Sequence, residues 1–399
     1  MLCTRVHNRE EEKVIESIPD SEFKQRHARV QGEVNKSGLD VLIVHSDEAD
    51  FANVRYLSDY WPIFECAGAL IPKEGDLILL IGPESETYAR DRSKIKEIRK
   101  ILQYRESAEP DYPNIKLDTF EAIFSQINNG KPVKRLGIGG WQVMPVAVYE
   151  AIKKALPDTE IVKADNILAN LRMIKSENEI AIMRQAYKIA EHGVQQVLAK
   201  IKPGMTELQV VGIAQEAIYS KGAEYEGYPV YLFAGKSTNN AISRPTRRKI
   251  NKGEMIQIGV GAKVCGYCST ISIPVCIGKM PPEMRRLTEV GLEAHKKTME
   301  FMRAGVAAKE VVINFNRFVE SKGCSENLLY GPCHGTGMME VEIPWVEETS
   351  EYLLQENMTF AVDTFLYTQN YGLRWERGAR VTKDGVEELS KKYKEIMEL

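Results

Sequence analysis

Three residues of this 399-residue chain combine an ionisable side chain with a setting that favours chemistry. His334 lies in YGPCHGTGMMEVEIP, where glycines leave the backbone bare and allow close approach of a ligand or a second strand. Asp363 lies in TFAVDTFLY, and Glu376 lies in GLRWERGARV. A carboxylate in an apolar strand must be paired, hydrogen-bonded or functional, because isolated burial of its charge is costly. A histidine beside carboxylates can act as an acid–base group or as a metal ligand.

Further candidates lie close to these three in the sequence. Glu342 follows His334 and could add acid–base capacity. Arg374 alternates in phase with Glu376, so it should face the same cleft and could bind a substrate carboxylate. A salt bridge between Glu376 and a neighbouring arginine is the structural alternative. Cys333 adjoins His334, but neighbours on a strand point to opposite faces, so a Cys–His dyad is not expected.

Two kinds of element must position these residues. Up to about residue 165, strands alternate with helices, as in the helix 21–37, the strand 40–45 and the two strands of 69–82, which predicts an α/β domain. Ser176 and Glu179 then form a capping box that opens a long helix.

The second half of the chain repeats itself. The segments 204–211 and 305–312 share a pattern, and Ser-Lys-Gly recurs at 220–222 and 321–323. Two such units related by a pseudo-two-fold axis would enclose a cleft. Thr270 and Glu376 are counterparts under this symmetry, and both should line the cleft.

Composition excludes several classes of function. The net charge of −3 indicates no basic face, so we expect no nucleic-acid partner. The N-terminus resembles no signal peptide, and no run of 18 apolar residues predicts a membrane span. Seven scattered cysteines predict no disulfide framework, and we expect a reducing, cytoplasmic location.

Several motifs resemble those of creatinases, prolidases and aminopeptidase P, and they follow in the family's order along nearly the whole chain. They are Arg172-x-x-Lys-Ser-x-x-Glu179-Ile, Pro203-Gly-Met-Thr-Glu207, Lys252-Gly-Glu, Gly266-Tyr267, His334-Gly-x-Gly and Gly372-x-Arg-x-Glu376. The resemblance implies an α/β (α+β) protein with two domains. These are a creatinase-type N-terminal domain over 1–165 and a C-terminal "pita-bread" domain over 166–399 with the internal repeat.

Metallopeptidases of this family hold two metal ions with two Asp, one His and two Glu. The resemblance places these ligands at Gly259, Thr270, His334, Asp363 and Glu376. Both aspartates are therefore missing, and a two-metal site, which needs several carboxylates, should not form.

We therefore predict a metal-independent, creatinase-like hydrolase of a non-peptide C–N bond in a small carboxylate-bearing substrate, with no cofactor. Its catalytic groups would be His334, Glu376, Asp363 and Glu342. Creatine hydrolysis itself does not transfer, because Ile242 and Ser272 stand where creatinase has its acid–base histidine and a glutamate.

Two alternatives remain open. The first is an Xaa-Pro peptidase with a single Mn²⁺, Fe²⁺ or Zn²⁺ ion on His334, Asp363 and Glu376. The second is a catalytically inactive binding protein.

The resemblance also implies a homodimer in which an N-terminal loop reaches over the partner's pocket. The matching segment is 58–68, so Tyr60, Trp61 and Phe64 are assigned to substrate binding, although they could equally form the domain's own core and loop. Tyr267 of the matched Gly-Tyr motif and Thr270 complete the predicted substrate-binding set, with Arg374.

Overall fold

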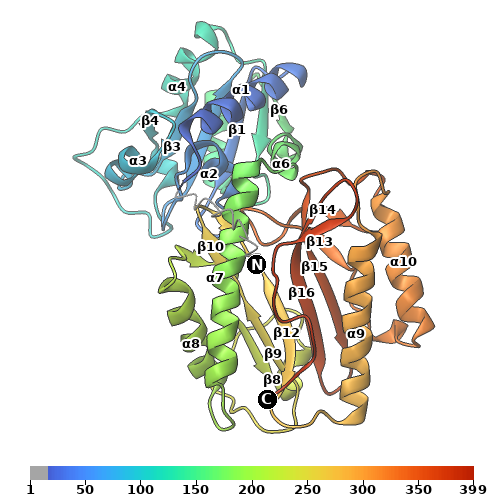
Figure 1. The fold of residues 1–399 in the computed structure, drawn as a ribbon. Helices are drawn as coiled ribbons and strands as arrows, with labels where there is room; N and C mark the ends of the chain where they lie inside the picture. The colour runs from blue at the N-terminus through green and yellow to red at the C-terminus, as the bar shows by residue number, and fades with distance from the viewer. Residues whose placement is uncertain (1–16) are drawn as a thin grey trace, which may run out of the picture.

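The computed structural model describes residues 17–399, and its first part is a mixed six-stranded sheet (Figure 1). The strand order is β4-β3-β2-β1-β5-β6, in which β1 pairs with β2 antiparallel and with β5 parallel. The strands are β1 Val41–Ser46, β2 Ala67–Pro72, β3 Ile78–Ile81, β4 Glu97–Lys100, β5 Arg135–Gly139 and β6 Glu160–Lys163. β6 is the last strand of this sheet along the chain, and α6 follows it and packs on the same domain.

Helices cover this sheet on both sides because its central strands are fully buried and therefore need apolar cover on each face. The helices are α1 Asp20–Lys36, α2 Ala52–Ser58, α3 Glu86–Arg92, α4 Phe120–Gln126, α5 Val146–Ala155 and α6 Asp165–Met173, with short 3₁₀ turns η1 Leu102–Tyr104 and η2 Asn128–Gly130. The predicted helix over 21–37 corresponds to α1, and the predicted strand over 40–45 corresponds to β1.

The second part is built on a nine-stranded sheet and a small three-stranded sheet. The large sheet has the order β14-β13-β15-β16-β12-β9-β8, with β17 and β18 attached to β16 and β12. Its strands are β8 Tyr231–Ala234, β9 Ile256–Val260, β12 Ile271–Cys276, β13 Cys333–Gly335, β14 Glu342–Val346, β15 Thr359–Tyr367, β16 Gly372–Val381, β17 Val386–Glu388 and β18 Met397–Glu398. The small sheet contains β7 Tyr225–Glu226, β10 Ala262–Val264 and β11 Tyr267–Cys268.

Two helix pairs flank the large sheet and carry the internal repeat. They are α7 Glu177–Lys200 with α8 Glu207–Tyr219, and α9 Pro282–Phe301 with α10 Ala308–Ser321; η3 Gly235–Asn239 and η4 Ser325–Asn327 are short turns. Figure 1 shows one pair beside β8 and β9 and the other beside β15 and β16. Ser176 and Glu179 form the predicted capping box of α7. The α/β pita-bread architecture and its repeat are as predicted.

Candidate active site

The register of the large sheet places the candidate residues in one row. Gly259 of β9 is opposite Ser272 of β12, Ser272 is opposite Glu376 of β16, and Glu376 is opposite Asp363 of β15. Residues directly opposite in antiparallel strands project to the same face. His334 of β13 is opposite Ala361, two residues from Asp363, and therefore shares this face.

His334 lies in a cluster with two glutamates. Ligand atoms of His334, Glu340 and Glu376 all lie within 4.8 Å of one another. The Nε2 atom of His334 is 3.6 Å from Oε1 of Glu340, and its Nδ1 atom is 3.0 Å from the carbonyl oxygen of Gly335. His334 and Glu376 are buried, whereas the Glu340 side chain is 26% exposed. This is the one cluster of metal-ligand type found among residues 17–399.

Burial raises the pKa of Glu340 and of Glu376, and the nearby Asp363 carboxylate acts in the same direction on both. Arg374 opposes this effect on each of them. Oε1 of Glu376 is buried and has no hydrogen-bond partner. The cluster therefore holds more acidic oxygen than its surrounding donors satisfy, which is the setting in which a cation is stabilised.

Asp363 lies outside this cluster, and its carboxylate has an ion-pair partner, although its Oδ1 atom accepts no hydrogen bond. Its Oδ1 atom is 3.2 Å from Nε of Arg374, and its Oδ2 atom accepts a hydrogen bond of 2.7 Å from the Tyr330 hydroxyl. Arg374 also donates to Tyr330 and to the carbonyl of Ala241. Glu340 therefore replaces Asp363 as a candidate metal ligand. Because the Arg374 guanidinium is already engaged with Asp363, it is less available to bind a substrate carboxylate than the sequence predicted.

The two positions that would complete a two-metal site carry Gly259 and Thr270, neither of which offers a carboxylate. A Cβ atom at Gly259 would lie 2.6 Å from the Tyr228 hydroxyl and 2.9 Å from Oγ of Ser272. Thr270 is fully buried, with its hydroxyl 3.4 Å from that of Tyr187. A second metal ion does not fit these residues.

Glu342 is engaged elsewhere, which corrects its predicted place in the acid–base group. It forms ion pairs with Arg172 and, at 3.6 Å, with Lys175, and it accepts a hydrogen bond from the backbone of Met339. Burial acts in the opposite direction, but Arg172 and Lys175 hold the pKa of Glu342 below its usual range. The Glu342 carboxylate therefore stabilises the segment around Met339 and does not take part in the acid–base group.

Tyr267 also lies outside the cluster, contrary to its predicted role at the substrate. Its hydroxyl donates to Glu179 at 2.6 Å and accepts from Arg26 at 3.0 Å, so it joins α7 to α1. Arg377 faces away from Glu376, as the strand alternation predicts, and contacts Ser390.

The three residues of the predicted aromatic loop have different surroundings. Tyr60 is fully buried in the core, 5.2 Å from the Tyr88 ring, and is not a loop tip. Trp61 packs 4.5 Å from the ring of Phe51 and lines a cavity of this same chain. Phe64 is 78% exposed. Of the three, Phe64 is the residue free to reach a second molecule.

The cavity beside the cluster has a volume of about 670 Å³. Its walls carry Phe51, Trp61, Tyr228 and Lys263, and Glu340 contributes one side. Aromatic walls with a few polar groups are typical of a small-molecule site.

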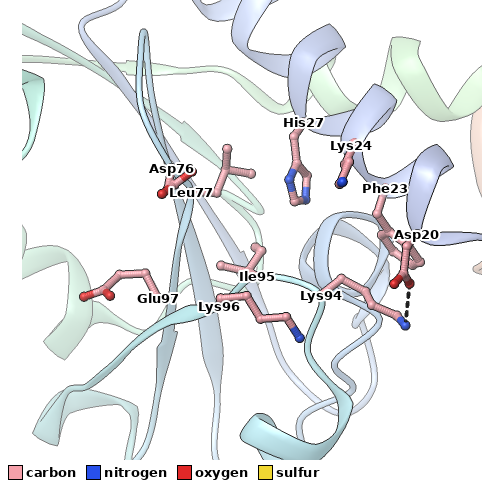
Figure 2. Close-up of a pocket in the computed structure, with 10 residues that line it drawn as sticks. All are labelled: Asp20, Phe23, Lys24, His27, Asp76, Leu77, Lys94, Ile95, Lys96 and Glu97. Atoms are coloured by element: carbon pink, nitrogen blue, oxygen red, sulfur yellow. Dashed lines mark ion pairs between the residues drawn. The ribbon is translucent and has the colours of Figure 1, made fainter.

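A smaller cavity of about 340 Å³ lies in the N-terminal domain, between α1 and the segment 94–97 (Figure 2). Lys24, His27, Lys94 and Lys96 line it, and Lys94 pairs with Asp20 at 2.8 Å. No member of the acidic cluster lines this cavity, so we place the chemistry in the C-terminal domain.

Two family models match the chain. Residues 181–383 match "Metallopeptidase family M24", and residues 26–174 match "Creatinase/Prolidase N-terminal domain". The first match covers half of the chain. The chain belongs to metallopeptidase family M24. It is accordingly a hydrolase acting on C–N bonds, as predicted.

Relatives of this M24 protein carry peptidase names. The Xaa-Pro dipeptidase of Pyrococcus horikoshii is 25% identical over 91% of this chain and 96% of its own length. The putative dipeptidase YkvY of Bacillus subtilis is 26% identical over 62% of this chain and 69% of its own. The X-Pro aminopeptidase structure from Thermotoga maritima superposes with a TM-score of 0.81 at 22% identity, over 94% and 99% of the two chains, and shows the fold.

These matches overturn the predicted metal-independent hydrolysis of a non-peptide bond. The family is one of metallopeptidases, and the relatives are named for Xaa-Pro peptides, so the prediction is wrong.

Glu340 is the member of the acidic cluster that the sequence did not identify. Glu340 and Glu342 lie in the same segment, two residues apart, so alternation alone cannot separate them. A shift of register between His334 and Gly335 places Glu342 opposite Gly335 and leaves Glu340 in the loop beside the histidine.

Proposed function

We propose that this M24 protein is a one-metal peptidase that hydrolyses Xaa-Pro dipeptides. The observation that supports it is the cluster of His334, Glu340 and Glu376 at the wall of an aromatic cavity. The names of the relatives supply the substrate class.

These residues fit one divalent ion. One imidazole and two carboxylates suit Mn²⁺, Fe²⁺ or Zn²⁺, and the unpartnered Oε1 of Glu376 would gain a ligand bond. The carbonyl of Gly335 accepts from Nδ1 of His334, which keeps the lone pair of Nε2 available. When bound, the ion would polarise the scissile carbonyl as a Lewis acid.

The remaining groups bind and orient the substrate. The rings of Phe51, Trp61 and Tyr228 offer apolar faces on which a prolyl ring can pack. Arg374 holds Asp363 away from the cluster and keeps that carboxylate from competing for the ion.

The proposal is tested by hydrolysis of Ala-Pro with protein stripped of metal and then reloaded with Mn²⁺. We expect activity that chelation abolishes and that Glu340→Gln and Glu376→Gln each reduce by at least roughly a hundredfold. Glu356→Gln removes an exposed carboxylate outside the site and is the matched control. Absence of hydrolysis with every divalent ion, or full activity of Glu340→Gln, would overturn the proposal.

We further propose a cytoplasmic homodimer. No disulfide forms among the cysteines of residues 17–399, which supports a reducing compartment. No helix within that range is long and apolar enough to cross a membrane. Ile63 and Phe64 are exposed in the connection between α2 and β2 and would enter the partner's cavity. Light scattering should give a dimer mass, and Phe64→Ser should weaken it; a monomer at micromolar concentration would contradict the dimer.

A further inference from the structure

Lys263 is a buried cation whose direct contacts are a thiol and a carbonyl rather than a carboxylate. It lies on β10 with 4% of its surface exposed. Its Nζ atom is 2.8 Å from Sγ of Cys268 and 3.3 Å from the carbonyl oxygen of Met338. No carboxylate of residues 17–399 forms an ion pair with it. A thiol and a carbonyl do not neutralise its charge, and the carboxylate that acts on it at longer range is Glu340 of the same cavity.

Two aromatic rings flank this ammonium group. It lies 4.6 Å from the centroid of Phe51 and 5.7 Å from that of Trp61. Arg55 approaches the same rings, but its guanidinium is also paired with Glu224 at 2.8 Å. The rings stabilise both cations, but Arg55 is in direct contact with a carboxylate, whereas Lys263 interacts with Glu340 only at longer range and has room for an anion beside it.

The cavity supplies the place for that anion. Lys263, Phe51 and Trp61 line it together with Glu340 of the metal cluster. The carbonyl that Lys263 contacts belongs to Met338, two residues before Glu340. Lys263 and the cluster of His334, Glu340 and Glu376 therefore border the same cavity, and the segment from Met338 to Glu340 connects them.

We propose that Lys263 binds the free carboxylate of the substrate and thereby restricts the enzyme to dipeptides. This inference rests on the proposed function. A dipeptide carries its carboxylate on the residue that follows the scissile bond, so the carboxylate and the scissile bond can share one cavity. A longer peptide places an uncharged amide at that point and leaves Lys263 unpaired. The rings of Phe51 and Trp61 would hold the ammonium in place for the carboxylate.

The test compares Ala-Pro with Ala-Pro-amide on the metal-loaded protein. Lys263→Met keeps most of the apolar stem and removes the charge. We expect it to raise KM for Ala-Pro by roughly ten- to a hundredfold, the range of a charge-assisted hydrogen bond. KM for the amide should stay within about twofold. Lys263→Arg should restore part of the loss, and Lys249→Met, at an exposed site outside the cavity, is the matched control.

A second measurement separates this inference from the proposed function. Calorimetry of N-acetylproline binding to the chelated protein needs no hydrolysis. Binding by the unchanged protein that Lys263→Met abolishes supports the carboxylate site even if no peptide is cleaved. Equal effects of Lys263→Met on Ala-Pro and its amide, or no binding of N-acetylproline to either protein, would overturn it. Thermal unfolding of each variant checks that it is folded.

Discussion

The pair of Asp363 and Arg374 offers the sharpest test of how the site is held together. Their atoms approach to 3.2 Å, and the side chains are 7% and 10% exposed. Removing one partner of a buried pair leaves the other as an uncompensated charge, which costs about 3–5 kcal/mol. Asp363→Asn keeps the shape and an acceptor for Tyr330, so we expect a loss of unfolding free energy in this range. Arg374→Met should cost a similar amount.

The double variant distinguishes pairing from two independent roles. If the residues stabilise each other, Asp363→Asn/Arg374→Met should be more stable than the sum of the single effects implies, by about 1–3 kcal/mol. Urea unfolding of the four proteins measures this coupling. Glu289→Gln breaks an exposed ion pair to Arg285 and should cost less than about 1 kcal/mol. Additive effects, or a loss below 1 kcal/mol for Asp363→Asn, would refute the reasoning.

Three further predictions concern packing, charge and pH. Gly259→Ala should lower the unfolding free energy by about 1–3 kcal/mol, because its Cβ atom meets the Tyr228 hydroxyl; an unchanged urea midpoint would contradict the crowding. Glu342→Gln should destabilise the fold by about 3–5 kcal/mol in urea and leave metal stoichiometry intact, whereas lost metal binding would restore Glu342 to the site. Burial lowers the pKa of His295 to about 3, so the unfolded chain binds a proton first as pH falls below about 6.5. The unfolding free energy should therefore fall as the pH is lowered from 6.5 towards 3. The slope should be steeper in the unchanged protein than in His295→Leu, by up to about 1.4 kcal/mol per pH unit. Equal slopes in urea unfolding at pH 4–6 would contradict this.

The strand periodicity was sufficient to predict which candidate residues share one face of the large sheet. His334, Asp363 and Glu376 lie on one face because each occupies the expected phase of a buried strand. The same alternation places Arg374 on this face and Arg377 on the other. The alternation of side chains is a local property of a strand, so it can be predicted from a single sequence.

The partners of these residues depend on contacts distant in sequence. Asp363 takes Tyr330 and Arg374 as partners, and both contacts require the strands to be paired first. Glu340 enters the site through a register shift that no periodic pattern encodes. Tyr267 follows a two-residue turn in which Cys265 and Gly266 have positive φ, and its hydroxyl is then taken up by Glu179 of another element.

The most direct test of the account is the number of metal ions that the protein binds. Isothermal titration of chelated protein with Mn²⁺, accompanied by elemental analysis, measures it. We predict one ion per chain, lost in Glu340→Gln and retained in Asp363→Asn. Two ions per chain, or one ion that Asp363→Asn removes and Glu340→Gln leaves, would contradict the one-metal site on His334, Glu340 and Glu376.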